Sequence, residues 1–494
     1  MQIKILNGTM VTSAEVFKAD IGIENGVITK IERKSKTANA DLLPEFEADN
    51  VIDAKDQYIL PGGVDVHTHF DMPFGGTVTA DNFYTGMVAA ACGGTTTIID
   101  FAIQNKGETL KQILDNWHKK AETKAVIDYS FHIALTDVND NTISEIPDII
   151  NQGVTSFKLF MAYKGSLMSS QETIGKILAE SGKLGFLTMI HCENGEEIDK
   201  LTKELLSNGK TSPFYHSLSR PADSEEYAVS QAIKLASDNS GNLYVVHLSS
   251  EGGLKNIKKT LLGNKKVFAE TCPQYLTLSI DKYTETPNTP LIKGNKDDIN
   301  IPSEFEGAKY VMSPPLRGKY NLSALWDGVK NGAINVVASD HCAFNFRGQK
   351  TLGLNDFSKI PNGIPGVETR LYLLFNAAIK DKHIDINKLV DVFATAPAKL
   401  FGLYPKKGEI RIGADADVVI FNPNKKLHIK RIKLHQDVDY CPFEGYKGTG
   451  FISYVIANGK IIVRDRAFCG AKGSGKFLKR NKFDPLCLQA SSSK

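Results

Sequence analysis

Several features that would mark a specialised class of protein are absent from the 494-residue sequence. No stretch approaches the ~20 consecutive apolar residues that a membrane-spanning helix needs. The first eight residues lack the apolar run and the small-residue cleavage site of a signal peptide. The net charge is only +3, from 59 Lys and Arg against 56 Asp and Glu, which does not favour a polyanion as ligand. We therefore expect no membrane segment and no nucleic-acid partner.

Cysteine is scarce and shows no pairing pattern. The seven cysteines are odd in number, scattered along the chain and without C-x-x-C spacing. This usage is typical of reduced thiols and predicts a cytoplasmic protein. The hydrophobic fraction of 42% and the charged fraction of 23% are ordinary for a globular chain. The length allows one large domain with an elaboration, or two to three smaller domains.

Two distant segments share a β-hairpin pattern. Alternating apolar residues surround Asn25-Gly26 near one end of the chain and Asn458-Gly459 near the other. Asn-Gly is the strongest short hairpin signal because both turn residues need a positive φ. Residues 408–413 and 417–421 also have the pattern of strands. We therefore predict one small β-sandwich domain that is built from both chain ends, residues 1–58 and 405–465.

The middle of the chain alternates short apolar runs with helix-like stretches. The helix-like stretches include residues 110–125, 170–181 and 221–237, and eight apolar runs lie at residues 63–67, 96–101, 129–135, 155–160, 185–191, 243–248, 266–270 and 334–340. Apolar strands that alternate with helices indicate an α/β protein with a parallel sheet covered on both faces. Eight of them fit a (β/α)8 TIM barrel over residues 59–404, with a doubly wound sheet as the alternative.

Two further segments have no place in that barrel. Residues 284–302 are rich in Pro, Asn and Asp, which predicts a surface excursion between the last two strands. Residues 466–494 carry Phe477, Leu478 and Phe483 among basic residues. We expect this C-terminal arm to contact another subunit.

Residues that can bind a metal fall at the carboxyl ends of the predicted strands. His67 and His69 are two apart in a strand, so their side chains point to the same face. His191, His247 and Asp340 each end a different strand. Taken singly, each has a plain structural interpretation, such as a hydrogen-bonded histidine or a helix N-cap aspartate. Together they favour Zn²⁺ or a similar ion, because barrel enzymes place their chemistry at this end.

Lys158 is the most informative residue of the set. It lies in an apolar run, residues 155–162, that implies burial, although alone it could keep its ammonium in water. Near two dications an ammonium would be repelled, by ~4 kcal/mol for unit charges about 4 Å apart at an effective dielectric constant of ~20. Carbon dioxide can convert the amine into a carbamate, which is negative and has two oxygens. We predict a carboxylated Lys158 (N6-carboxylysine) that bridges two Zn²⁺ ions.

Eight segments together resemble a known family. They are residues 60–69 (LPGGVDVHTH), 93–96 (GGTT), 157–165 (FKLFMAYKG), 191–195 (HCENG), 270–275 (ETCPQY), 313–317 (SPPLR), 339–342 (SDHC) and 359–363 (KIPNG). With them the chain resembles the cyclic amidohydrolases of the amidohydrolase superfamily, specifically dihydropyrimidinase and hydantoinase, over nearly its whole length. The resemblance implies a metal-loaded barrel with a small β domain, and a homotetramer.

The resemblance also implies roles for individual residues. One zinc would be held by His67, His69, Lys158 and Asp340, and the other by Lys158, His191 and His247, with a hydroxide as second bridge. Asp340 and Tyr163 would be catalytic, and Tyr163, Ser313 and Asn362 would bind the substrate. The implied reaction opens dihydrouracil, dihydrothymine or a 5-substituted hydantoin to an N-carbamoyl amino acid.

Three alternatives stay open. The segment 70–74 (FDMPF) after His-x-His is similar to that of dihydropyrimidinases, whereas allantoinases and dihydroorotases usually carry a different one, often with Arg. Within it, Phe70 and Met72 are expected to shape the hydrophobic side of the site. A non-catalytic scaffold such as a collapsin response mediator protein would have lost metal ligands, and this chain retains all six. The thiol of Cys342, beside Asp340, is a third possibility as nucleophile.

Overall fold

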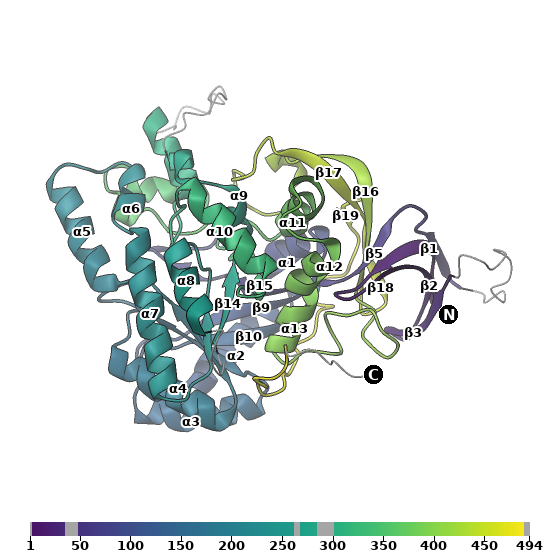
Figure 1. The fold of residues 1–494 in the computed structure, drawn as a ribbon, viewed down its shortest axis with the longest axis horizontal. Coiled ribbons are helices and arrows are strands. Elements are labelled where there is room, and N and C mark those ends of the chain that lie inside the picture. Colours follow the sequence, from purple (N-terminus) through teal and green to yellow (C-terminus); the bar gives the residue numbers. More distant parts are fainter. Residues whose placement is uncertain (1, 35–47, 261–266, 284–300, 489–494) are drawn as a thin grey trace.

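The computed structural model describes residues 2–34, 48–260, 267–283 and 301–488, and it has two parts (Figure 1). Helices surround a barrel of strands on the left of Figure 1, and a separate sheet lies on the right. Most of the predicted excursion at 284–302, the first residue of the strand predicted at 266–270 and the last six residues of the arm lie outside the described residues. None of the described helices is long and apolar enough to cross a membrane.

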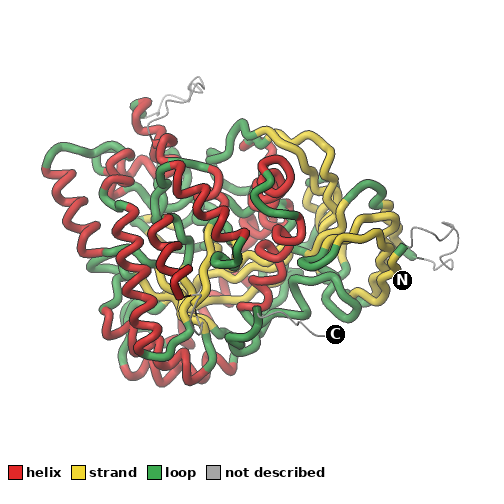
Figure 2. The backbone as a smooth tube through the Cα atoms, in the orientation of Figure 1, coloured by secondary structure: helices red, strands yellow, loops and turns green. Residues whose placement is uncertain are grey.

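Eight parallel strands form the barrel sheet. Their order in the sheet is their order in the chain: β6 (Gly63–Thr68), β9 (Thr95–Ile103), β10 (Asp128–Ala134), β11 (Ser156–Phe160), β12 (Leu187–His191), β13 (Leu243–Val245), β14 (Val267–Thr271) and β15 (Val336–Val337). A parallel bridge between Thr68 and His341 joins the first strand to the segment after the last. The predicted (β/α)8 fold is confirmed, and Figure 2 shows its strands enclosed by helices.

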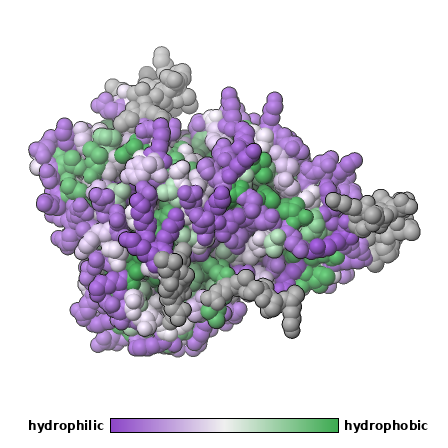
Figure 3. All heavy atoms as spheres, viewed as in Figure 1, coloured by the Kyte–Doolittle hydropathy of each residue, from purple (hydrophilic) through white to green (hydrophobic). Residues whose placement is uncertain are grey.

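Helices cover the outside of this sheet. They are α1 (Phe83–Cys92), α2 (Leu110–Ala121), α3 (Asp140–Asn151), α4 (Gln171–Leu184), α5 (Gly195–Ser207), α6 (Phe214–Leu218), α7 (Ala222–Asp238), α8 (Glu251–Thr260), α9 (Pro273–Thr277), α10 (Lys319–Lys330), α11 (Arg370–Asn376), α12 (Ile386–Val390) and α13 (Ala396–Leu400). The predicted α2 and α4 begin where Thr109 and Ser170 accept hydrogen bonds from free backbone N–H groups. The face seen in Figure 3 is mostly hydrophilic, as expected for helices that bury one side.

Shorter helical turns lie in the connections. They are η1 (Ile280–Tyr283), η2 (Ser303–Tyr310), η3 (Lys350–Gly353), η4 (Phe357–Lys359), η5 (Ala377–Asp381), η6 (Asp391–Thr395) and η7 (Arg431–Lys433). Of these, η3 and η4 belong to the long connection that follows β15. This connection also returns to the barrel mouth, and it therefore helps to build the site described below.

Two strands have at most half of their predicted length, and the reason is local backbone geometry. The strand predicted at 243–248 ends at Val245, and the strand predicted at 334–340 is only Val336–Val337. His247 has φ 37° and Asp340 has φ 49°, so neither residue continues an extended strand. Such left-handed conformations cost about 1–3 kcal/mol each and concentrate at functional positions. These conformations direct the His247 and Asp340 side chains into the pocket at the carboxyl end of the barrel.

Two buried arginines donate hydrogen bonds to neighbouring barrel strands that share few or no ladder hydrogen bonds with each other. Arg370 donates to the carbonyls of Val64 on β6 (3.1 Å) and Val337 on β15 (3.2 Å), the first and last strands. Arg480 of the C-terminal arm donates to the Phe131 carbonyl on β10 (2.6 Å) and to Ser156 Oγ on β11 (2.8 Å). Side chains from distant segments thus replace missing ladder hydrogen bonds in the barrel wall.

The second sheet is assembled from both chain ends. It contains β1 (Ile3–Val11), β2 (Val16–Glu24), β3 (Val27–Arg33), β4 (Asn50–Asp53), β5 (Tyr58–Pro61), β16 (Val418–His428), β17 (Lys447–Ala457), β18 (Lys460–Arg464) and β19 (Ala467–Phe468), while β7 (Pro73–Phe74) and β8 (Thr77–Val78) form a separate hairpin. Strands β5 and β16 pair antiparallel and join the two ends. An apolar core that includes Ile5, Ile21 and Ile420 lies within this sheet.

Both predicted Asn-Gly hairpins are confirmed. Asn25 and Gly26 have φ 52° and 80°, and Asn458 and Gly459 have φ 49° and 72°. All four turn residues therefore adopt the positive φ that this turn requires. The strand predicted at 408–413 is wrong, because a glycine with positive φ stands at each end of it and the chain turns there.

The aromatic side chains of the C-terminal arm pack on the chain's own barrel. Leu478 donates to the Tyr129 carbonyl of β10 (2.7 Å), and the Phe477 ring lies 5.7 Å from that of Phe131. The Phe483 ring lies 5.4 Å from that of Phe268. The barrel therefore supplies the surface that these residues need, and an oligomer contact by the arm stays a prediction.

A buried ion cluster connects the barrel to the second sheet. Lys407 Nζ lies 2.7 Å from Asp128 of β10, 2.8 Å from Asp417 and 3.1 Å from Asp415. Lys407 is only 1% exposed, so its charge is compensated entirely by these carboxylates. Removing one partner of a buried ion pair costs far more than the pair contributes, because the remaining charge is left uncompensated.

Lys407→Met is therefore expected to lower the free energy of unfolding by about 3–5 kcal/mol. Lys406→Met is the matched control, because Lys406 is the exposed neighbour and should change stability by less than about 0.5 kcal/mol. Urea-induced unfolding followed by circular dichroism measures both. Equal midpoints for the two variants would show that the cluster contributes nothing.

Candidate active site

The predicted metal ligands meet at the carboxyl ends of five barrel strands. They are His67 and His69 at the end of β6, Lys158 on β11, His191 on β12, His247 after β13 and Asp340 after β15. All except His67 line one pocket, together with Tyr163, Ser313 and Asn362. His67 lies behind Lys158, whose Nζ is 3.1 Å from His67 Nε2. The structure thus brings together all six predicted metal ligands and the three predicted substrate-binding residues.

Three of these residues form a tight buried cluster. Asp340 Oδ1 lies 3.3 Å from His67 Nε2 and 3.3 Å from His69 Nε2. The ligand atoms of the three residues all lie within 4.8 Å of one another. Burial lowers the pKa of both imidazoles, so their nitrogens are available as lone-pair donors. Imidazole nitrogens with a carboxylate oxygen are the donor set that zinc and similar ions bind.

The two remaining histidines face each other on the other side of the site. His191 Nδ1 lies 3.0 Å from His247 Nε2, and both residues are buried. Burial lowers the pKa of both rings. Two neutral imidazoles that converge in this way also suit a divalent cation. The site therefore offers two groups of ligands that fit metal binding.

Lys158 lies between aromatic rings and imidazoles. Its Nζ is 4.3 Å from the centre of the Phe101 ring and 5.1 Å from that of Phe160. Burial lowers the pKa of Lys158 to about 8, although the Asp340 and Glu270 carboxylates oppose this change. Because the ordinary value is about 10.4, the neutral amine is far more abundant here than in an exposed lysine.

Buried carboxylates behind the ligands orient them. Glu270 at the end of β14 contacts His67 Nδ1 and accepts a hydrogen bond from the Tyr244 hydroxyl (2.9 Å). His67 therefore turns its Nε2 toward Asp340 and Lys158. Such a carboxylate behind a histidine ligand fixes both the tautomer and the ring orientation. Glu270 was not predicted as a site residue from the sequence, although it lies near the carboxyl end of a barrel strand, as the predicted ligands do.

Glu193 does the same for His191. Its Oε2 accepts a hydrogen bond from His191 Nε2 (2.7 Å) and pairs with Arg220 (2.6 Å). Burial would raise the pKa of Glu193, but Arg220 and His191 outweigh it and hold this pKa at about 2. Glu193 is therefore ionised, and His191 presents Nδ1 to His247. The sequence showed no signal for Arg220, which lies in the short connection between α6 and α7.

Tyr163 closes one side of the pocket. It has φ 68°, and its ring lies 5.3 Å from that of His191 and 5.7 Å, edge to face, from that of Phe74. Burial raises the pKa of its hydroxyl, although Arg220 and the Ser313 and Asn362 side chains act in the opposite direction. The hydroxyl is therefore protonated at neutral pH and can donate a hydrogen bond.

Ser313 and Asn362 contribute unused backbone groups to the pocket. Among the described residues, no hydrogen bond occupies the N–H or C=O of Ser313 or the N–H of Asn362. In contrast, the neighbouring carbonyls of Val311, Met312 and Pro314 all accept hydrogen bonds. Buried backbone groups normally have partners, so this strip is suited to a ligand with its own donors and acceptors.

The hydrophobic side of the pocket differs from the prediction at one position. Met72 and Phe74 line it as part of the segment after His-x-His. Phe70 does not line it, because its ring is fully buried against Phe83 and His341. Gly86 of α1 makes room for this ring, since an added Cβ would lie 2.2 Å from it. Phe70 thus belongs to the core behind the site.

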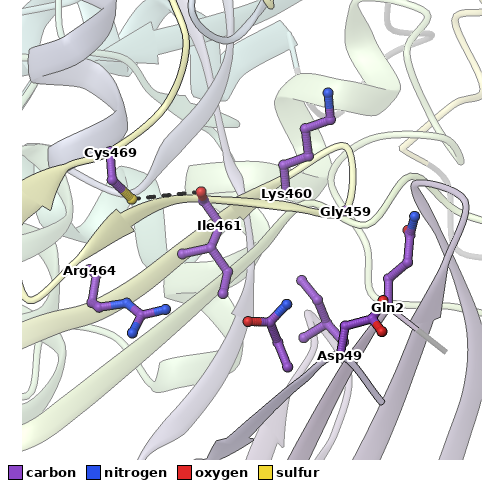
Figure 4. Close-up of a pocket in the computed structure, with 9 residues that line it drawn as sticks. Gln2, Asp49, Gly459, Lys460, Ile461, Arg464 and Cys469 are labelled. Carbon is purple, nitrogen blue, oxygen red and sulfur yellow. Dashed lines mark hydrogen bonds between the residues drawn. The ribbon is translucent and has the colours of Figure 1, made fainter. Parts of the chain in front are cut away.

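A second hollow lies on the small sheet, away from these residues (Figure 4). It is lined by polar residues that include Gln2, Asp49, Lys460 and Arg464, with Cys469 beside them. None of the residues selected from the sequence for the site takes part in it.

A (β/α)8 barrel with histidine, lysine and aspartate side chains at its strand ends defines a class of metal-binding barrel enzymes. The chain matches the amidohydrolase family over residues 58–462. It is 46% identical to the D-hydantoinase of Geobacillus stearothermophilus over 98% of this chain and 97% of that protein. It is 43% identical to the D-hydantoinase of Streptomyces coelicolor over 96% and 97% of the two chains. The crystal structure of dihydropyrimidinase from Brevibacillus agri superposes with a TM-score of 0.90 at 44% identity, over 98% of this chain and 100% of that one. The chain belongs to the amidohydrolase family, and it is a hydrolase.

Proposed function

We propose that this enzyme opens the ring of 5,6-dihydropyrimidines or 5-substituted hydantoins to give N-carbamoyl amino acids. The observation that carries the proposal is the convergence of neutral imidazoles, Lys158 and Asp340 beside the free backbone groups of Ser313 and Asn362. The first arrangement suits hydrolysis, and the second suits a cyclic imide, whose N–H and C=O alternate along one edge. The names of the D-hydantoinase and dihydropyrimidinase relatives agree with this chemistry.

The proposed cofactor is a pair of Zn²⁺ ions. His67, His69, Lys158 and Asp340 would hold one ion, and Lys158, His191 and His247 the other. Two bound dications would polarise the ring carbonyl and lower the pKa of water so that hydroxide forms near neutral pH. Glu270 and Glu193 support this proposal because each holds one ligand histidine in a fixed orientation.

Lys158 is proposed to act as a carbamate. The lysine ammonium first loses one proton; its neutral amine then attacks carbon dioxide, a C–N bond forms and a second proton is released, so the side-chain charge changes from +1 to −1 overall. The lowered pKa of about 8 supports this step, because roughly one amine in ten is then neutral at pH 7. As a carbamate, Lys158 would have two oxygens with which to help hold both ions.

The chain's own residues then move the protons. Asp340 accepts a proton from the attacking water and later donates it to the ring nitrogen as the C–N bond breaks. The Tyr163 hydroxyl donates a hydrogen bond to the carbonyl oxygen while negative charge develops there. The backbone groups of Ser313 and Asn362 hold the imide edge, and the Met72 and Phe74 side chains contact the apolar substituent.

A substrate panel tests the proposal. Dihydrouracil, dihydrothymine, 5-substituted hydantoins, allantoin and dihydroorotate are compared by ultraviolet absorbance, with zinc measured by elemental analysis. We expect turnover of the dihydropyrimidines or hydantoins and two metal ions per chain. Preference for allantoin or dihydroorotate would indicate another cyclic amidase, and absence of both turnover and metal would indicate a scaffold.

Cys342→Ser should leave kcat within about twofold of the wild-type value. The Cys342 thiol lines the pocket, but burial raises its pKa far above the usual range, so it is not a thiolate. Its Sγ instead contacts the Asn362 carbonyl at 3.7 Å. Steady-state kinetics on the best substrate of the panel measures the effect. A loss of several orders of magnitude would make the thiol a nucleophile.

Two further proposals concern the protein in the cell. We propose a homotetramer, on the strength of the family resemblance, and a cytoplasmic location, because none of the seven cysteines forms a disulfide. Light scattering of the purified protein measures the first, and cell fractionation the second.

A further inference from the structure

Lys350 is a fully buried lysine outside the group of predicted ligands. It begins η3 in the long connection after β15, and its exposed fraction is 0%. Among the described residues, no carboxylate forms an ion pair with it. Lysine is almost never fully buried without such a partner, so this position requires an explanation.

The Lys350 amine joins the two segments that carry Ser313 and Asn362. Its Nζ donates to the carbonyl of Val311 at 2.9 Å and to the carbonyl of Pro361 at 3.0 Å. Val311 precedes Ser313 by two residues, and Pro361 directly precedes Asn362. One amine therefore connects two segments that are about fifty residues apart in the chain.

The same junction is tightly packed. Gly363 donates its N–H to the Val311 carbonyl at 3.0 Å, which is the carbonyl that Lys350 also contacts. Gly363 has φ 147°, and a Cβ added there would lie 2.4 Å from the carbonyl oxygen of Cys342. Neither segment can therefore shift easily. The distance between the free backbone groups of Ser313 and those of Asn362 depends on this junction.

Burying this amine is costly, which argues against a role in packing alone. Burial lowers the pKa of Lys350 to about 7, so the charged form is disfavoured inside the protein. A methionine would fill the same space without that cost. What a methionine cannot do is donate N–H groups to both carbonyls, and the amine does so in either protonation state.

We propose that Lys350 is a positioning residue that sets the spacing between the backbone groups of Ser313 and Asn362, and thereby the affinity for the imide edge of the substrate. The inference rests on the proposed function, which gives those backbone groups their ligand. Lys350 forms no hydrogen bond to the predicted metal ligands within the described residues. It should therefore act on substrate binding and not on metal content.

Lys350→Met tests the inference, with Lys359→Met as the matched control. Lys359 lies in the same connection, but its side chain is 70% exposed. For Lys350→Met we expect KM to rise about tenfold or more, kcat to stay within about threefold and metal content to equal that of the wild type. For Lys359→Met we expect no change. Steady-state kinetics, elemental analysis and the thermal midpoint of each variant are measured together.

The outcomes separate the two proposals. An active wild-type enzyme whose KM is unchanged in Lys350→Met overturns the inference alone, and so does a variant that loses its metal. A wild-type enzyme that opens no cyclic amide overturns the proposed function and the inference with it. If Lys350→Met does not fold, Lys350→Gln is measured instead: its amide keeps N–H donors, but its side chain is one bond shorter and brings them less far toward the two carbonyls. A raised KM with wild-type metal content in that variant supports the inference, and an unchanged KM contradicts it.

Discussion

Replacing Asp340 by asparagine is expected to lower kcat by about 10²- to 10⁴-fold while most of the bound metal is retained. Asparagine has the same shape and an oxygen that can still face His67 and His69, each 3.3 Å from Asp340 Oδ1 in the wild-type chain. An amide cannot accept a proton from water and return it to the leaving nitrogen. The loss should therefore lie in the chemical step, with KM changed much less.

The experiment compares kcat, KM and metal content for Asp340→Asn and for Asp115→Asn. Asp115 lies on the exposed face of α2, where it pairs with Lys111, so its replacement should leave all three quantities unchanged. Turnover near the wild-type rate in Asp340→Asn would remove Asp340 as the base. Loss of both metals would assign it to binding alone.

Replacing Lys158 by alanine is expected to empty the binuclear site and abolish turnover. The proposed carbamate would help to hold both ions, so its removal should weaken metal binding at both groups of histidines at once. Alanine also leaves a cavity beside Phe101 and Phe160. Elemental analysis should find well below two metal ions per chain, and kcat should fall by several orders of magnitude.

A small carboxylic acid should partly restore the Lys158→Ala variant. Acetate or propionate fits the space that the lysine leaves and supplies the two oxygens of the missing carbamate. The effect should saturate with acid concentration and raise metal content and turnover together. Lys164→Ala is the control, since Lys164 is half-exposed near the same pocket and pairs with Glu196. Two metals per chain in Lys158→Ala without added acid would contradict the bridging role.

Much of the fold is predictable from local patterns. Each barrel strand is an apolar run, and the starts of α2 and α4 follow from cap residues such as Thr109 and Ser170. The Asn-Gly turns follow from the need for positive φ. Errors occur where the backbone leaves its regular conformation, at His247, Asp340 and the glycines that flank 408–413. Those conformations depend on surrounding contacts that no local pattern contains.

The site has two layers of residues, those at the strand ends and those buried behind them, and only the first layer can be predicted from the sequence. The residues at strand ends can be selected from the sequence because parallel strands bring all their carboxyl ends to one edge. The residues behind them cannot be selected in this way, since the residue type alone does not distinguish a buried glutamate or arginine from an exposed one. Only the structure identifies them, by their contacts: Glu270 contacts His67, Glu193 accepts a hydrogen bond from His191, and Arg220 pairs with Glu193.

The amino-acid sequence by itself determined the barrel, the family resemblance and the six side chains that meet at its mouth. The reason is that apolar strands, and their alternation with helices along the chain, are patterns of the local sequence. Only the tertiary structure decided how those side chains are held and what lies beside them. It places Arg370 between the first and last strands, buries Phe70 behind the pocket, and sets the Lys350 amine between two distant carbonyls. These are contacts between segments far apart in the chain, and their geometry follows from how the whole molecule packs.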